Sequence, residues 1–160
     1  MAKRHPSLLP LSHDHHHGLA LALRCRKQAL GQTKPIGAQG LRRRAEEFLQ
    51  LYATELDSHF RAEEEILFPE MRMRVPNTGQ LIDDLMRDHA TIRRAVPRLD
   101  GGSDLGKLIF DLGDLLERHI RREERELFPL FEQHAGEVDA AKIGAQISQI
   151  FARRSMQKVF

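Results

Sequence analysis

A chain of 160 residues with 41% hydrophobic and 30% charged side chains has the composition of a globular protein, and its length suits a single domain over residues 1–160. The formal charge of +2 is too near neutrality to indicate a nucleic-acid partner by itself, and no apolar run approaches the roughly 18 residues of a membrane span. One cysteine, Cys25, leaves no intrachain disulfide and no cysteine-based zinc site. We expect a cytoplasmic protein without a nucleic-acid or membrane partner.

Apolar residues recur at helical spacing along most of the chain, and alternating apolar runs typical of strands are nearly absent. Four long helices are predicted, at residues 11–30, 41–73, 81–96 and 104–131. Turn residues separate them, and Ser103 or Asp104 is expected to cap the fourth. This order predicts an all-α, up-down four-helix bundle over residues 8–134. A shorter helix at 138–153 is expected to pack outside the bundle or to form a homodimer interface.

Two stretches of the second and fourth predicted helices are nearly the same: HFRAEEEILFP at 59–69 and HIRREERELFP at 119–129. Each has a histidine followed four residues later by a glutamate, His59 with Glu63 and His119 with Glu123. Residues i and i+4 lie on one face of a helix, and leucines of the predicted core share that face. Both pairs are therefore predicted to point into the bundle.

The other two helices carry a second match, LSHDH at 11–15 and LMRDH at 85–89. The shared Asp-His places His15 and His89 on apolar stripes, so each half of the chain contributes one His and one His–Glu pair. His16 also lies near the apolar face and stays an alternative to His15, although the Asp-His match favours His15. His13 and His17 are expected to face outward or toward the mouth of the bundle.

Burying four imidazoles and two carboxylates without a cation would cost several kcal/mol for each group. A metal removes that penalty because the polar groups become ligands. Imidazole and carboxylate without sulfur suit iron, zinc or manganese, and two carboxylates able to bridge suit two ions.

These residues resemble the hemerythrin-like (HHE cation-binding) domain family over about residues 8–134. The resemblance implies a hemerythrin-like bundle with two non-haem iron ions, joined by an oxo or hydroxo bridge and by Glu63 and Glu123. The implied ligands are His15, His59, Glu63, His89, His119 and Glu123. It also implies a protein that binds or senses O2, NO, or redox or iron state. The alternatives are an enzyme acting on peroxide or O2, and an iron-handling or iron-centre repair protein.

The sequence departs from the oxygen-carrying members, which have a second histidine on the third helix, one turn from the first. Here Leu85 and Arg93 hold the positions one turn from His89. Unless His13 or His16 supplies a further ligand, four His and two Glu give each iron two nitrogens and two oxygens. With a solvent bridge, about one position then stays open on each ion. This favours reaction with O2, peroxide or NO over reversible carriage of O2.

The sequence pattern also predicts the roles of four residues outside the proposed ligand set. Glu64 and Glu124 follow the two bridging candidates and are interpreted as helix-flank residues, with hydrogen bonding to a ligand histidine as the alternative. Tyr52 and Cys25 are interpreted as core residues, and a hydrogen-bonding or redox neighbour is the alternative for Tyr52.

Overall fold

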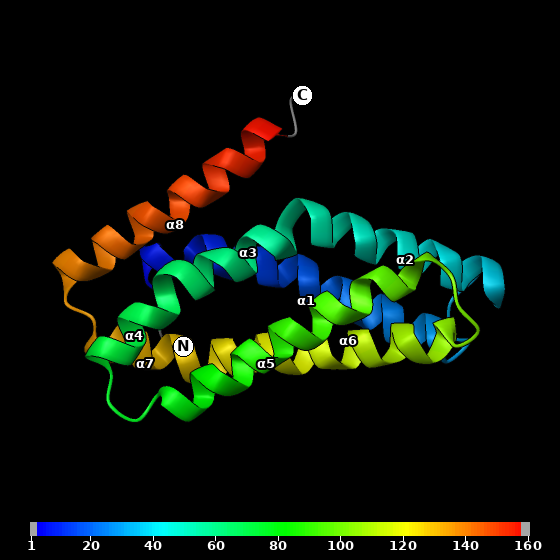
Figure 1. Ribbon diagram of the computed structural model, residues 1–160, viewed down its shortest axis with the longest axis horizontal. Coiled ribbons are helices and arrows are strands. Elements are labelled where there is room, and N and C mark those ends of the chain that lie inside the picture. Colours follow the sequence, from blue (N-terminus) through cyan, green and yellow to red (C-terminus); the bar gives the residue numbers. More distant parts are fainter. Residues whose placement is uncertain (1–2, 158–160) are drawn as a thin grey trace.

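Every regular element that the described residues form is a helix, as Figure 1 shows. The structure is a computed structural model that describes residues 3–157, with side chains up to residue 154. The elements are η1 (Pro6–Leu8), α1 (Leu9–Ala29), α2 (Ala38–Leu51), η2 (Tyr52–Leu56), α3 (Asp57–Ala62), η3 (Glu63–Leu67), α4 (Phe68–Arg74), α5 (Gly79–Ala95), η4 (Val96–Asp100), α6 (Leu105–Arg122), η5 (Glu123–Leu127), α7 (Phe128–His134) and α8 (Glu137–Gln157).

Four long rods form the predicted bundle, so the all-α prediction is confirmed. The segments from α2 to α4 follow one another without a break and make the second rod, and α6, η5 and α7 make the fourth. The second rod begins at Ala38, three residues before the predicted start, because Gly40 lies inside the helix rather than in the turn. A side chain at Gly40 would overlap the carbonyl oxygen of Pro35, so glycine is needed there for close packing.

The two repeated segments each contain a widened helical turn. The π-helical turns η3 and η5 begin at Glu63 and Glu123, and in each the phenylalanine that follows donates its N–H to the carbonyl of that glutamate. The next residue is Pro69 or Pro129, which has no N–H and whose ring would clash with the carbonyl four residues earlier in a regular helix. A wider turn relieves that clash, which gives the shared Leu-Phe-Pro ending a structural cause.

The apolar core consists of two clusters, and the ligand candidates lie between them. In α1, Leu11 belongs to the first cluster and Leu21 to the second, with His15 between the two. In α5, Leu85 and Ile92 belong to the two clusters in the same way. The bundle therefore holds a polar layer with apolar packing on both sides along its length.

The helix α8 has 21 residues, as many as α1, so the prediction of a short C-terminal helix was wrong in length. It crosses the outside of the bundle over η1 and α3, in orange and red in Figure 1. Ile143, Ile147 and Phe151 form its buried face. Gly144 lies close to Ser7 at the crossing, where a side chain would collide with it. None of the helices in the described part of the chain has the length and apolar character needed to cross a membrane.

Candidate metal centre

The structure brings the six predicted ligand residues together in the polar layer. They form two groups of four residues. In each group, one nitrogen or oxygen atom from every residue lies within 4.8 Å of the corresponding atoms of the other three. The first group is His15, His59, Glu63 and Glu123, and the second is Glu63, His89, His119 and Glu123. The exposed fraction is at most 4% for every one of the six. Both glutamates belong to both groups, as expected for carboxylates that bridge two ions.

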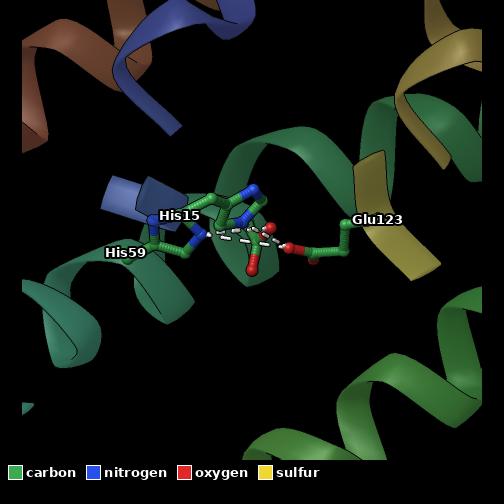
Figure 2. A group of neighbouring side chains, drawn as sticks. His15, His59 and Glu123 are labelled. Carbon is green, nitrogen blue, oxygen red and sulfur yellow. Dashed lines mark hydrogen bonds and ion pairs between the residues drawn. The ribbon is translucent and has the colours of Figure 1, made fainter. Parts of the chain in front are cut away.

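All four imidazoles turn their Nε2 atoms toward these carboxylates. In the first group, Nε2 of His15 lies 3.0 Å from Oε1 of Glu123, and Nε2 of His59 lies 3.5 Å from Oε2 of Glu63. Figure 2 shows the imidazoles of His15 and His59 facing the carboxylate of Glu123.

The second group repeats this arrangement. The Nε2 atom of His89 lies 3.1 Å from Oε1 of Glu63, and that of His119 lies 3.5 Å from Oε2 of Glu123. The two halves of the centre therefore present the same set of donor atoms.

Several of the inward-facing atoms are buried without a hydrogen-bond partner among the described residues. These atoms are both carboxylate oxygens of Glu63, Oε2 of Glu123, and Nε2 of His89 and His119. A buried polar atom without a partner costs about 1–3 kcal/mol, so a natural fold rarely gathers five in one place. Imidazole nitrogens and carboxylate oxygens are also the donors that iron, zinc and manganese accept. The residues present therefore fit a pair of such ions.

Each imidazole is also fixed from behind, because its Nδ1 atom contacts a carboxylate. The four pairs are His15 with Glu124 at 2.6 Å, His59 with Asp14 at 2.9 Å, His89 with Glu64 at 2.6 Å, and His119 with Asp88 at 3.0 Å. An ionised carboxylate can only accept, so Nδ1 carries a proton, and loss of any second proton leaves the lone pair of Nε2 for a metal.

These contacts correct the interpretation of Glu64 and Glu124 as flank residues. Both are hydrogen-bond acceptors for the histidine of another helix, Glu64 for His89 and Glu124 for His15. The preceding glutamate of each pair contacts the other nitrogen of the same imidazole. Sequence reasoning used Asp14 and Asp88 as markers of the repeat and missed their role. The signal was the Asp-His dipeptide, but each aspartate contacts the histidine of the neighbouring helix rather than its own neighbour in sequence.

In the absence of a metal, opposite charges in and around the centre shift several pKa values. Burial would raise the pKa of Glu63, but the positive charge of a protonated His59 opposes burial, and the pKa stays well below its ordinary range. Burial would lower the pKa of His59, but Glu63 and Asp14 raise it well above the ordinary value. For Glu64, hydrogen bonds from His89 and Arg93 outweigh burial and lower the pKa to about 2. Glu64 is therefore ionised at neutral pH.

The neighbouring histidines of α1 take no part in this layer. His13, His16 and His17 are exposed, and Nδ1 of His17 lies 2.8 Å from a carboxylate oxygen of Glu55 at the surface. The structure thus places His15, and not His16, among the six residues. The reason is direction, since one residue of α1 turns the side chain by about 100°.

Two further residues lie in the second apolar cluster. Cys25 is fully buried there, as predicted for a core residue. Tyr52 packs against the same cluster and is partly exposed, with its hydroxyl 3.5 Å from a carboxylate oxygen of Asp57. Neither side chain belongs to the two groups of ligand candidates.

Comparison with known proteins gives one match. The sequence model of the hemerythrin HHE cation binding domain matches residues 8–131, which is most of the chain and includes all six inward-facing residues. No curated protein and no solved structure matches the chain. The match extends over the four rods of the bundle and stops before α8. The chain belongs to the hemerythrin HHE cation-binding domain family.

Proposed function

We propose that this chain holds two non-haem iron ions. His15 and His59 would bind one ion, His89 and His119 the other, and the shared carboxylates of Glu63 and Glu123 would bridge them. The observation that supports this most strongly is the cluster of five buried donor atoms without a partner among the described residues. A structural role alone leaves that cluster unexplained, because the surrounding core could have been apolar.

We further propose that the protein binds or senses a small molecule such as O2, NO or peroxide. Two adjacent iron ions supply redox chemistry toward such molecules. The chain itself controls access, because the six residues are exposed by at most 4% and apolar clusters lie on both sides. Burial of this degree admits diatomic molecules and peroxide far more readily than an organic substrate.

The two groups of donors support sensing or reaction over reversible carriage. Each group offers two imidazoles, so the described side chains would give neither ion more protein ligands than the other. The two positions near His89 that could supply another donor are otherwise engaged. Leu85 is fully buried in the first apolar cluster, and Arg93 donates to Glu64 at 2.7 Å.

Metal content and the visible spectrum of aerobically purified protein test the first proposal. We expect about two iron ions per chain and near-ultraviolet charge-transfer absorption. One zinc ion per fully loaded chain with a featureless spectrum would contradict the assignment of two irons. Loading the metal-free protein with iron, zinc or manganese in parallel identifies the preferred ion.

Ligand addition tests the second proposal. Azide should shift the spectrum of the ferric protein, and the ferrous protein should oxidise rapidly on exposure to O2. A stable coloured complex that releases O2 under vacuum would instead identify an oxygen carrier. Catalytic consumption of peroxide, at a rate that depends on bound iron, would support the enzyme alternative.

A further inference from the structure

The outer carboxylates that hold the histidines differ between the two halves of the centre. Asp14 and Asp88 occupy equivalent places in the repeat, behind His59 and His119. The side chain of Asp14 is 1% exposed and that of Asp88 is 25% exposed. Within the described part of the chain, an arginine pairs with Asp14 and none pairs with Asp88. The proposed ligands are therefore equivalent in the two halves, but the aspartates that contact the ligand histidines are not.

The arginine that pairs with Asp14 is Arg154, which lies on α8. Its two terminal nitrogens contact the two carboxylate oxygens separately, Nη2 to Oδ1 at 2.7 Å and Nη1 to Oδ2 at 3.0 Å. The same Oδ2 accepts from Nδ1 of His59 at 2.9 Å. Such a two-point contact fixes the plane of the carboxylate, and with it the direction from which Asp14 holds the imidazole.

Arg154 is itself held in place by the elements around it. Its Nη1 donates to Oγ of Ser58 at 3.1 Å and to the carbonyl of Glu55 at 3.3 Å. Its guanidinium lies 3.8 Å from the centre of the Phe151 ring. That ring stacks on the imidazole of His59, with 6.3 Å between centroids and 25° between planes. Arg154 and Phe151 thus position His59 from two sides, one through Asp14 and one directly.

The helix α8 follows both copies of the repeat and is not itself repeated. Its contacts therefore support one half of the centre without an equivalent in the other half. It contacts α3, which carries His59 of the first group, and also η1 and η3. The histidine of the second group that is equivalent to His59 is His119, and its aspartate is one-quarter exposed. Water can therefore compete for Asp88, whereas Asp14 is shielded.

We propose that Arg154 is a positioning residue that makes the first metal position, at His15 and His59, bind its ion more tightly than the second position at His89 and His119. This inference rests on the proposed function, because it concerns the relative affinities of the two metal positions. The physical basis is preorganisation: an imidazole already held in its binding direction loses less freedom when a metal binds. Without Arg154, Asp14 would stay buried with only His59 to satisfy it, and its hold on the imidazole would loosen.

Cobalt(II) titration of the metal-free protein, followed in the visible spectrum, measures the two affinities. The wild type should bind two ions in two steps. His59→Ala should remove the tighter step, and His119→Ala should remove the weaker one. These two variants assign the steps to the two halves before Arg154 is changed.

Arg154→Met keeps an unbranched side chain and removes the guanidinium, with its contacts to Asp14 and to the Phe151 ring. It should weaken the tighter step by about 10–100-fold, the usual effect of losing an outer contact to a metal ligand, and change the weaker step less than about threefold. Arg154→Lys keeps the charge without the two-point contact and should give an intermediate loss. Arg153→Met, an exposed neighbour on the same helix, is the matched control and should leave both steps unchanged.

The selectivity of the effect separates positioning from general destabilisation, because a loosened fold would weaken both steps together. Equal weakening of both steps by Arg154→Met, or no change in either, would overturn the inference. Two wild-type steps of equal affinity would do the same while leaving the proposed function intact. Absence of any cobalt or iron binding by the wild type would instead contradict the proposed function.

Discussion

Three consecutive glutamates, Glu63, Glu64 and Glu65, allow the roles assigned around the centre to be separated in one experiment. Glu63 is fully buried and belongs to both groups of donors. The side chain of Glu64 is 21% exposed and contacts Nδ1 of His89, the ring nitrogen that does not face the centre. The side chain of Glu65 is 55% exposed and pairs only with Arg61, at 3.5 Å, among the described residues. Replacing each by glutamine removes one charge with almost no change of shape.

Each bound ion stabilises the folded state by about 2.7 kcal/mol when free metal is about 100 times its dissociation constant, so two ions add about 5 kcal/mol. In a chain of this length 1 kcal/mol shifts the melting temperature by about 2–4 °C, which gives about 10–20 °C between loaded and metal-free protein. Glu63→Gln should abolish most of this difference, because both ions lose a bridging carboxylate.

The other two variants should have graded effects. Glu64→Gln weakens one ion by about 10–100-fold, or about 1.4–2.7 kcal/mol, and should reduce the difference by about 3–10 °C. Glu65→Gln removes an exposed pair worth less than about 1 kcal/mol that makes no contact with the centre, so it should leave the difference unchanged.

Calorimetry or far-ultraviolet circular dichroism is the appropriate assay, since the chain has no tryptophan and one tyrosine. Each variant is melted with and without metal, so effects on the metal-free fold cancel from the comparison. Metal content is measured on the same samples. The reasoning would be refuted if Glu63→Gln retained two ions, or if Glu63→Gln and Glu64→Gln reduced the difference equally.

Three further predictions follow from single contacts. His15→Ala should lose the ion of the first group, whereas His16→Ala should keep both ions, and equal metal loss in the two variants would contradict the placement of His15. Burial raises the pKa of the Cys25 thiol from 9.0 to about 12, so the folded chain keeps a proton that the unfolded chain loses. The free energy of unfolding from urea titrations should therefore be unaffected by this group below about pH 9 and fall as the pH rises further, by up to about 1.4 kcal/mol per unit. Cys25→Ala should flatten that fall, and an unchanged slope would count against the assignment. Gly113→Ala should destabilise by about 1–3 kcal/mol, because its Cβ would lie 2.8 Å from the carbonyl oxygen of Ala22 where α1 and α6 pack closely. A gain in urea resistance, as expected from helix propensity alone, would show that the two helices separate easily.

The sequence alone determined the helical fold and the residues that meet in the polar layer. Helical spacing places His59 and Glu63 on one face whatever surrounds them, because that relation depends only on the turn of the helix. The repeat then predicted that the second half of the chain presents the same face. For the same reason the choice between His15 and His16 stayed open, since adjacent positions on an apolar edge differ only by the rotation of the helix within the bundle.

Tertiary structure decided the contacts behind the histidines. Glu64 and Glu124 accept from His89 and His15, which lie 25 and 109 positions away in the chain, and no local pattern relates such residues.

The asymmetry between the two halves also exists only in the folded chain. Arg154 is 140 positions from Asp14, in a helix outside the repeat, and in the sequence it reads as one more cation on a mixed face. Only the path of α8 across α3 brings its guanidinium to a buried carboxylate, where a two-point contact shielded from water has an effect that an exposed arginine lacks.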